Sequence, residues 1–375
     1  MKLLNKNKEV NETFHAKDLI GAMSYSVVIH KKQDQPLLLY MENSANNASA
    51  LFSDATADEL IATGGISLIK DAMKRLKIQV VENQAIPSLT QGYFICEPDK
   101  LAGDMNGLVY EKEIGNMPKL FFSNIPTNLP FPTSSFLSIE VCKRKEGLPR
   151  SCEFDVEKYY KCLNTKTLGK AMIYFSVCET TMNISKSLFN ALPTFDGILV
   201  IAGIQTKGFG RSGNQWLSPK GCAMFTFNFN IPLFSNLGQS ATFIQHILAV
   251  SIVDAVITIL QIEDFSLKIK WPNDIYWARM FKMGGILVNS SISGETLHCV
   301  IGAGINVCNN KPTVSLNDMI PEDYDKILTV EEVIAETMNK FEQVRSKQNG
   351  KVFSVHDNGN TFDMMKGLIR PKNKA

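Results

Sequence analysis

The stretch that decides the fold runs from Gly197 to Ile231 and reads GILVIAGIQTKGFGRSGNQWLSPKGCAMFTFNFNI. It begins with a continuous apolar run, which is typical of a buried strand. It ends with phenylalanines that alternate with polar side chains, which predicts a half-buried strand. Between the two strands lie three closely spaced glycines, Gly208, Gly210 and Gly213. The class of fold depends on which kind of loop these glycines form.

The glycine spacing matches a dinucleotide-binding fingerprint, but its surroundings do not. That fingerprint needs a helix after the glycines and an acidic residue about 20 positions further on. Here the loop leads directly into the phenylalanine-rich strand, and no Asp or Glu occurs between Asp196 and Asp254. The P-loop pattern is absent as well. What remains is a strand–loop–strand whose backbone N–H groups, with the guanidinium of Arg211, can meet an anion.

The rest of the second half alternates less regularly than a βαβ protein. Apolar runs predict further strands at Lys170–Cys178, Leu267–Trp271, Gly285–Asn289 and Leu297–Val307. Helical patterns predict Met182–Leu192, opened by the capping-type pair Thr180 and Thr181, the buried helix Ser240–Leu260, and Thr329–Arg345. Several strands in succession with helices set apart favour the α+β class, with a mixed or antiparallel sheet and flanking helices.

Composition excludes several classes of function. The chain has 375 residues and a net charge of +2, so no basic surface argues for nucleic acid. Its eight cysteines are single and form no C-x-x-C pair, which speaks against a zinc site and predicts no metal-ligand set. The apolar stretch Ile247–Leu260 contains Asp254 and is too short to span a bilayer. No apolar signal-peptide region follows the basic N-terminus, so we expect a cytoplasmic protein, with a mitochondrial pool as the second expectation.

Three later stretches add chemistry to the glycine loop. KWPND, at 270–274, ends a strand at its proline and leaves Asn273 and Asp274 at a loop rim. KMGGILV, at 282–288, places a lysine before two glycines, and taken alone it favours a hairpin turn with a solvated lysine. GAGIN, at 302–306, interrupts a strand with two glycines, which indicates either a bulge or the close approach of a ligand or another backbone.

In this order the motifs resemble those of one family. The segment from about Phe154 to Leu316 resembles the catalytic domain of biotin–protein ligases, most closely the eukaryotic holocarboxylase synthetases. The matching pieces begin with TLGK at 167, ETTM at 179 and QTKGFGRSGNQWLSPKGCA at 205, and continue with KWPNDIYW at 270, KMGGILVNS at 282 and IGAGINV at 301. The resemblance implies a fold like that of class II aminoacyl-tRNA synthetases and biotin ligases. It divides the chain into residues 1–150, of uncertain fold and partly flexible, a catalytic domain at 154–346, and a C-terminal region at 347–375.

The resemblance also implies a reaction and a site. The family activates biotin with ATP to biotinyl-5′-adenylate and passes biotin to a lysine on the biotin-carrier domain of carboxylases, with Mg²⁺ on the phosphates. The implied catalytic cations are Arg211, Lys282 and Lys270. Two of these cations and four further residues are implied to contact biotin: Arg211, Lys282, Thr180, Thr181, Gln205 and Gly208. Adenylate contacts are implied for Gly210, Arg211, Trp216, Lys270, Asn273 and Asn306, whereas Asp274 serves either a metal or the loop.

Two departures and two alternatives accompany this interpretation. Phe209 stands where the family usually carries Lys or Arg. Residues 347–375 resemble only a truncated remnant of the family's C-terminal SH3-like domain, so we expect transfer to the acceptor to suffer more than adenylation. The alternatives are a lipoate–protein ligase of the same superfamily and a non-catalytic protein that binds biotin or the acceptor domain. Retention of three cations argues against the second, because a pure binder does not need them.

Overall fold

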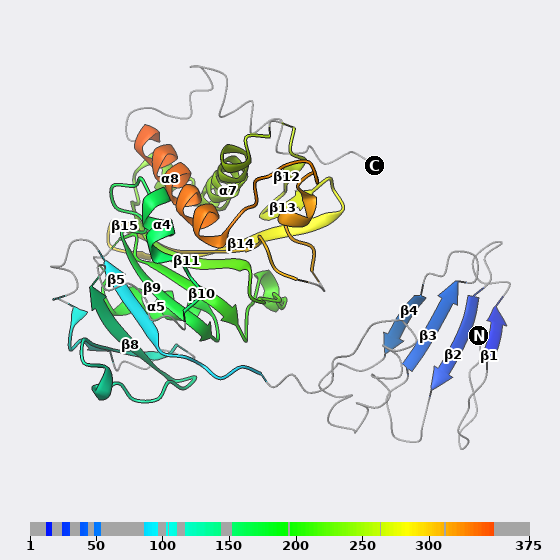
Figure 1. Cartoon of the computed structure of the whole chain (residues 1–375), viewed down its shortest axis with the longest axis horizontal. Coiled ribbons are helices and arrows are strands. Elements are labelled where there is room, and N and C mark those ends of the chain that lie inside the picture. The colour runs from blue at the N-terminus through cyan, green and yellow to red at the C-terminus, as the bar shows by residue number, and fades with distance from the viewer. Residues whose placement is uncertain are drawn as a thin grey trace. The chain divides into compact units, whose positions relative to one another are not determined.

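The computed structural model divides the chain into two compact units, Met1–Ala85 and Ile86–Ala375. It describes residues 86–96, 103, 105–110, 117–143, 152–193, 196–262, 264–310 and 313–348. In the first unit it describes only the backbone of four strands, β1 (Thr13–Ala16), β2 (Tyr25–His30), β3 (Leu38–Asn43) and β4 (Ser49–Ser53). These pair as an antiparallel meander in the order β1-β2-β3-β4 (Figure 1). Residues 54–85 and the tail beyond residue 348 lie outside the described residues.

The described part of the second unit is built on one 11-stranded sheet with the order β12-β13-β14-β15-β11-β10-β9-β5-β8-β7-β6. The strands are β5 (Gly92–Cys96), β6 (Val109–Tyr110), β7 (Lys119–Ser123), β8 (Phe136–Lys143), β9 (Ala171–Cys178), β10 (Leu199–Gln205), β11 (Cys222–Pro232), β12 (Leu267–Lys270), β13 (Asp274–Trp277), β14 (Phe281–Ser293) and β15 (Thr296–Asn306). The pairs β9–β10, β5–β8 and β7–β8 are parallel and the others antiparallel. The mixed sheet predicted from the sequence is therefore confirmed.

The boundary between 150 and 154 suggested by the sequence falls inside this unit. Strands β5 to β8 lie before it, yet β5 pairs directly with β9 from Gly92↔Phe175 to Cys96↔Ala171. The division into compact units comes at Ala85 and Ile86 instead. The strands β5 to β8 thus extend the sheet that carries the glycine loop.

Helices cover the two faces of the sheet unequally (Figure 1). On one face lie α4 (Val156–Cys162), α7 (Ile244–Leu260) and α8 (Val330–Gln348), and on the other lies α5 (Thr181–Ala191). Short helical turns occur at α6 (Asn236–Gln239) and at the 3-10 segments η1 (Pro126–Asn128), η3 (Arg211–Gly213), η4 (Ala241–Phe243) and η5 (Asn317–Met319). Each face has its own hydrophobic core, the larger one under α7 and α8.

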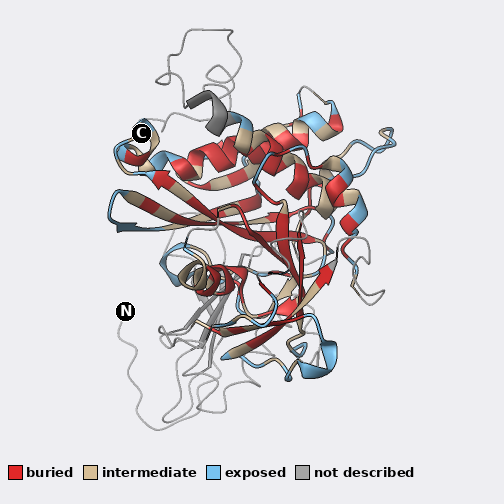
Figure 2. Cartoon of the chain, turned by 90° about the vertical axis from the view of Figure 1, so that its left-hand side faces the viewer, coloured by how far each residue is buried: buried red, intermediate tan, exposed pale blue. Residues whose placement is uncertain are grey.

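Helix α7 is the central element of the larger core. Among the described residues, Ala241–Leu260 is the one helical segment that is long and apolar enough to cross a membrane, and 67% of the 18-residue stretch that meets this test is buried inside the protein. Figure 2 shows buried residues along this helical layer and the sheet beneath it. Its carboxylate, Asp254, pairs with Lys340 of α8 at 3.2 Å, which explains an acidic residue in an apolar helix. The predicted buried helix is confirmed, although its first turn is 3-10.

Strand β11 corrects the prediction of a half-buried strand. Its phenylalanines Phe225, Phe227 and Phe229 face α7 and α8 and are fully or almost fully buried. Its polar residues Thr226 and Asn228 are also buried, because they face α5 rather than water. The alternation of phenylalanine and polar residues therefore reflects a strand that is covered on both faces, because its polar face hydrogen-bonds to α5.

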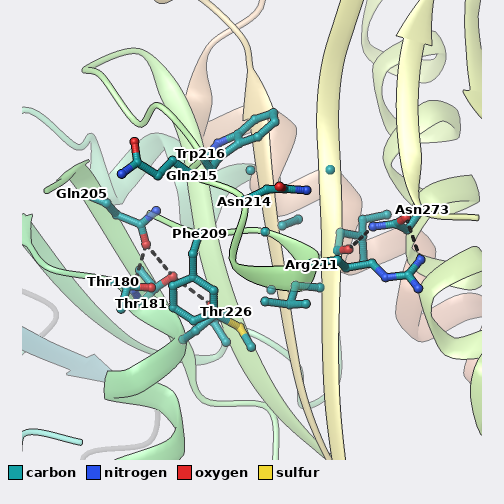
Figure 3. Close-up of a pocket in the computed structure, with 18 of the residues that line it drawn as sticks. Thr180, Thr181, Gln205, Phe209, Arg211, Asn214, Gln215, Trp216, Thr226 and Asn273 are labelled. Carbon is teal, nitrogen blue, oxygen red and sulfur yellow. Dashed lines mark hydrogen bonds between the residues drawn. The ribbon is translucent and has the colours of Figure 1, made fainter. Parts of the chain in front are cut away.

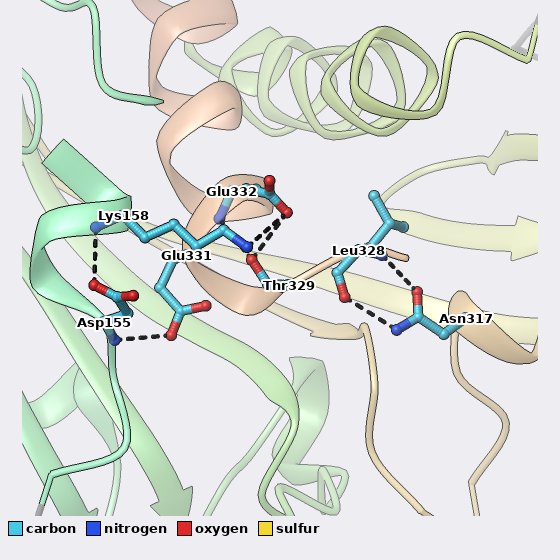
Figure 4. A network of polar contacts seen from close by, with 7 residues as sticks. All are labelled: Asp155, Lys158, Asn317, Leu328, Thr329, Glu331 and Glu332. Carbon is cyan, nitrogen blue, oxygen red and sulfur yellow. Dashed lines mark hydrogen bonds and ion pairs between the residues drawn. The ribbon is translucent and has the colours of Figure 1, made fainter. Parts of the chain in front are cut away.

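Polar contacts fix the start of α8 against α4 (Figure 4). The carboxylate of Asp155 accepts from the backbone N–H of Lys158 at 2.9 Å and caps α4. The backbone N–H of Asp155 donates to Glu331 at 3.1 Å, and Lys158 pairs with Glu332 at 3.4 Å. Such a cap contributes about 1 kcal/mol. The predicted helix at Thr329–Arg345 is confirmed, and its acidic first turn joins two helices that are far apart in sequence.

Candidate functional site

A cavity of about 260 Å³ opens where the glycine loop crosses the ends of β10, β11, β14 and β15 (Figure 3). The N-terminus of α5 and the turn between β12 and β13 complete its wall. It brings together eight of the residues singled out from the sequence, namely Thr180, Thr181, Gln205, Gly210, Arg211, Trp216, Asn273 and Lys282. The glycine loop and the three later sequence motifs thus contribute residues to one cavity.

The glycine loop is a narrow hairpin. The backbone N–H of Trp216 donates to Gly208 at 2.9 Å, and that of Gly210 donates to Asn214 at 2.7 Å. The turn at the tip uses left-handed backbone at Ser212, with φ of 56°, and at Gly213, with φ of 76°. A Cβ at Gly208 would lie only 2.6 Å from the Trp216 carbonyl oxygen, so the hairpin can close only with glycine there.

One end of the cavity, which we call the hydroxyl–amide end, consists of Thr180, Thr181, Gln205 and Thr226. The side-chain oxygen of Gln205 accepts from the backbone N–H of Thr181 at 2.8 Å and from its hydroxyl at 3.1 Å. The hydroxyls of Thr181 and Thr226 lie 2.8 Å apart. Thr180 occupies the N-cap position of α5, but its side chain makes no capping bond. The predicted capping role is therefore wrong, and both threonines contribute to the cavity instead.

The bonds at this end fix what it can offer to a ligand. A backbone N–H can only donate, so the Gln205 atom that faces Thr181 is the oxygen, and its two lone pairs are used. Among the described residues, the amide nitrogen of Gln205 donates one proton to Ser218 at 3.1 Å and has no partner for the other. Because the Thr181 proton points to Gln205, the Thr226 hydroxyl donates to Thr181 and keeps its lone pairs. This end therefore presents a donor beside acceptors.

The opposite end, which we call the cationic end, holds Arg211 and Lys282. Arg211 donates to the side-chain oxygen of Asn273 at 3.2 Å, and Asn273 donates in turn to the backbone of β14 at 2.7 Å. Lys282 pairs with Asp274 at 2.7 Å, and its ammonium lies 5.5 Å from the centre of the Trp216 ring. Each cation is thus held by one residue of the turn between β12 and β13.

Two expectations about this end need correction. Lys282 lies within the paired strand β14, between β13 and β15, and not in a hairpin turn, although its side chain is exposed as expected. Asn273 is buried, because its side chain turns inward to bridge Arg211 and β14, whereas a position at an open rim was expected. The prediction that Pro272 ends the strand is confirmed, since β12 ends at Lys270.

The glycines of β15 leave room for side chains of the site. A Cβ at Gly304 would lie 2.5 Å from the indole nitrogen of Trp216, and one at Gly302 would lie 2.5 Å from the sulfur of Met182. A ligand or another backbone was expected to approach these glycines, whereas the nearest groups are the side chains of a tryptophan and a methionine. Both side chains line the cavity.

Three residues singled out from the sequence do not line the cavity. The ammonium of Lys270 lies 4.6 Å from the centre of the Tyr276 ring, on the exposed side of β12. Asn306 is buried next to the cavity, where it accepts from the thiol of Cys222 at 3.0 Å. Gly208 lies at the base of the hairpin. Conversely, Thr226 was missed, and only its place in the alternating strand could have indicated it.

The thiols of the described residues near the site are neutral. Burial raises the pKa of Cys222 to about 12, and burial raises the pKa of Cys178, two residues before Thr180, still further. No group of three or more His, Cys, Asp or Glu side chains within the described ranges could hold a metal ion. The chemistry of the cavity thus depends on its cations and hydrogen-bonding groups.

Comparison with known proteins assigns the class of this domain. Residues 174–306 match the model of the biotin/lipoate A/B protein ligase family, and every residue that lines the cavity lies in this segment. The chain therefore carries a domain of that family.

Within the family the chain is similar to biotin–protein ligases. It is 38% identical over 277 residues to the biotin–protein ligase of Homo sapiens, covering 59% of this chain and 38% of that protein. It is 30% identical over 224 residues to that of Schizosaccharomyces pombe, covering 54% and 35%. The chain thus spans well under half the length of both relatives. A solved biotin protein ligase from Leishmania major in complex with biotinyl-5-AMP superimposes with a TM-score of 0.40 and 20% identity, covering 51% of this chain and 77% of that one.

Proposed function

We propose that this protein activates biotin with ATP to biotinyl-5′-adenylate and transfers the biotinyl group to a lysine on the biotin-carrier domain of a carboxylase. Three supports carry the proposal: the family domain, the similarity to biotin–protein ligases, and the cavity with its two unlike ends. The single observation that carries it furthest is the hydroxyl–amide end, because it distinguishes biotin from the related acyl substrate lipoate.

The head groups of the two acids differ in hydrogen bonding. The ureido ring of biotin has one carbonyl acceptor and two N–H donors, whereas the dithiolane ring of lipoate has only two weakly accepting sulfurs. The free amide proton of Gln205 suits the ureido carbonyl, and the lone pairs of Thr226 suit a ureido N–H. A buried site that leaves such groups unpaired loses about 1–3 kcal/mol per group. The hydroxyl–amide end therefore favours biotin.

The first step joins two anions. A carboxylate oxygen of biotin attacks the α-phosphorus of ATP, a P–O bond forms, and the bond to the leaving pyrophosphate breaks. Arg211 and Lys282 supply positive charge where the carboxylate and the phosphate meet, and Asn273 and Asp274 orient them before substrate arrives. In the second step the amine of the acceptor lysine attacks the acyl carbon, and AMP leaves. Neither step requires a nucleophilic side chain of this protein.

Mg²⁺ fits this site as a companion of ATP. Asp274 is the one carboxylate among the described residues that line the cavity, and it already pairs with Lys282. Protein-bound Mg²⁺ commonly takes one or two carboxylates and fills its other positions with substrate phosphates and water. Asp274 would hold the ion, which when bound neutralises phosphate charge.

Three measurements on the full chain test the proposal. Calorimetry compares the binding of biotin and lipoate, biotin-dependent exchange of pyrophosphate into ATP measures activation, and a biotin blot of a carrier domain measures transfer. We expect tighter binding of biotin, exchange, and a labelled carrier domain. Preferential binding of lipoate would show that lipoate, and not biotin, is the substrate. Binding of biotin without exchange would show that the protein binds biotin but does not activate it.

A further inference from the structure

A buried serine outside the cavity connects two parts of the site. Ser218 is 3% exposed and lies just after the glycine hairpin, and it does not line the cavity. Its hydroxyl oxygen accepts from the amide nitrogen of Gln205 at 3.1 Å and its proton goes to the carbonyl of Trp216 at 3.1 Å. One hydroxyl therefore touches both a group of the hydroxyl–amide end and the backbone of the hairpin.

The direction of these bonds has no alternative. The backbone N–H of Thr181 holds the oxygen of Gln205, so the other side of the amide must be the nitrogen, which can only donate. Ser218 must accept that proton, and its own proton is then free for the Trp216 carbonyl, which can only accept. A reversed chain of bonds would place two donors or two acceptors face to face. The polarity of Ser218 is thus dictated from both ends.

The backbone around Ser218 reinforces the link. The N–H of Gln205 donates to the carbonyl of Ser218 at 3.2 Å, which closes the base of the hairpin. A Cβ at Gly208 would lie 2.4 Å from the Ser218 hydroxyl oxygen, so the loop passes directly over it. Ser218 therefore lies beneath the base of the hairpin, and the same hairpin bears Arg211 and Trp216 at the other end of the cavity.

We propose that Ser218 is a positioning residue that couples the two ends of the cavity. A ligand that takes the free proton of Gln205 holds that amide, and through Ser218 it holds the carbonyl of Trp216 and the base of the hairpin. Binding of a neutral cyclic urea at the hydroxyl–amide end then steadies the loop on which Arg211 lies. The inference rests on the proposed function for the identity of that ligand, biotin.

The test compares Ser218→Ala with Ser251→Ala in the full chain. Ser251 is a matched control, because it is 1% exposed and its hydroxyl donates to the Ile247 carbonyl inside α7, outside the cavity. Calorimetry gives the biotin affinity, and trypsin cleavage after Arg211, at saturating biotin without ATP, reports on the loop. In the native chain and in Ser251→Ala we expect biotin to suppress cleavage. In Ser218→Ala we expect about ten-fold weaker binding and cleavage that saturating biotin no longer suppresses.

The outcomes separate the inference from the proposed function. No biotin binding by the native chain contradicts the proposed function. Biotin binding by the native chain, with equal protection of Arg211 in native protein and Ser218→Ala, overturns the coupling and leaves the proposed function standing. Thermal unfolding of both variants shows whether they fold. Where Ser218→Ala does not, Ser218→Cys keeps the space filled with a weakly hydrogen-bonding thiol and carries the same expectation.

Discussion

The two ends of the cavity are built by opposite means. At the hydroxyl–amide end Thr181 is 3% exposed and Thr226 is fully buried, and the bonds among the side chains there are made within the protein. At the cationic end the side chain of Lys282 is 39% exposed, and Arg211 is exposed with Asn273 as its hydrogen-bond partner. The side chains of the hydroxyl–amide end are therefore buried and bonded to one another without a ligand, whereas those of the cationic end remain exposed.

This difference agrees with the ligands that we propose for the two ends. A neutral polar ring is selected by fixed donors and acceptors, and burying them is inexpensive when they are already paired. Two buried cations without an anion would cost several kcal/mol each in desolvation. Exposure of Arg211 beside Asn273, and of Lys282 beside the carboxylate of Asp274, avoids that cost in the absence of ligand. Burial at one end and exposure at the other thus suit the neutral ring and the phosphate of the proposed substrates.

The largest effect that we expect comes from Arg211→Ala. Removal of a preorganised charged donor from a transition state costs about 3 kcal/mol or more, which is about a hundred-fold or more in rate. Biotin-dependent pyrophosphate exchange should therefore fall by about that factor, while biotin binding falls much less. Exchange close to the native rate would contradict the assignment of Arg211 to the reacting phosphate.

Two lysine variants serve beside it. Lys220→Ala is the matched control, because Lys220 is an exposed cation that pairs with Glu153 at 2.5 Å, and it should leave exchange unchanged.

Lys270→Ala tests whether Lys270 has the catalytic role that the sequence motif implies or the position outside the cavity that the structure shows. Because its ammonium lies over Tyr276, outside the cavity lining, we expect at most a few-fold loss. A loss as large as that of Arg211→Ala would show that Lys270 reorients when ATP binds.

The sequence predicted those parts of the fold that rest on local patterns. The strands β9, β10 and β15 and the helix α7 come from long apolar runs and α8 from a regular helical pattern, so they were located to within about four residues. The extension of the sheet by β5 to β8 was not predicted, because pairing of β5 with β9 depends on contacts between residues about 80 positions apart. The burial of β11 on both faces was missed for a similar reason, since α5 covers its polar side.

Parts of the candidate site could be predicted where the backbone leaves a pattern in the sequence. Glycines inside a strand indicated that something approaches closely, but not that it would be the side chains of Trp216 and Met182 at Gly304 and Gly302. Side-chain direction could not be predicted in the same way. Lys270 belongs to the same motif as Asn273, yet the alternation of β12 turns its ammonium to the surface. Ser218 carries no sequence signal, because its bonds depend on an amide 13 positions earlier.

An intermediate effect is expected from Thr181→Val at the hydroxyl–amide end. The two side chains have the same shape, so the substitution removes one hydroxyl, and Gln205 and Thr226 each lose a bond. Unpaired buried groups cost about 1–3 kcal/mol, so biotin affinity should fall by about ten-fold or more while the maximal exchange rate changes less. Ser251→Ala is again the control. A lower maximal rate with unchanged affinity would assign Thr181 to the chemistry and break the division between the two ends.

The smallest effect concerns the support of the cationic end. The ring of His246, on α7, stacks on Trp271 with centroids 4.3 Å apart and planes 14° apart, directly before the turn that carries Asn273. Burial lowers the pKa of His246 below its usual 6.5, and neither ring nitrogen has a hydrogen-bond partner among the described residues. The unfolded chain therefore binds the proton more readily than the folded chain does. The stability that the neutral ring contributes is complete above pH 6.5 and is lost as the pH falls towards the lowered pKa. We expect the free energy of unfolding, from urea denaturation, to fall between pH 8 and pH 6 in the native chain and to fall less in His246→Phe, which keeps an aromatic ring against Trp271.

Carboxylates titrate mostly below this range and are common to both chains. Identical pH profiles would show that His246 is not the titrating group beneath the turn, and that the cationic end has no support that depends on proton binding there.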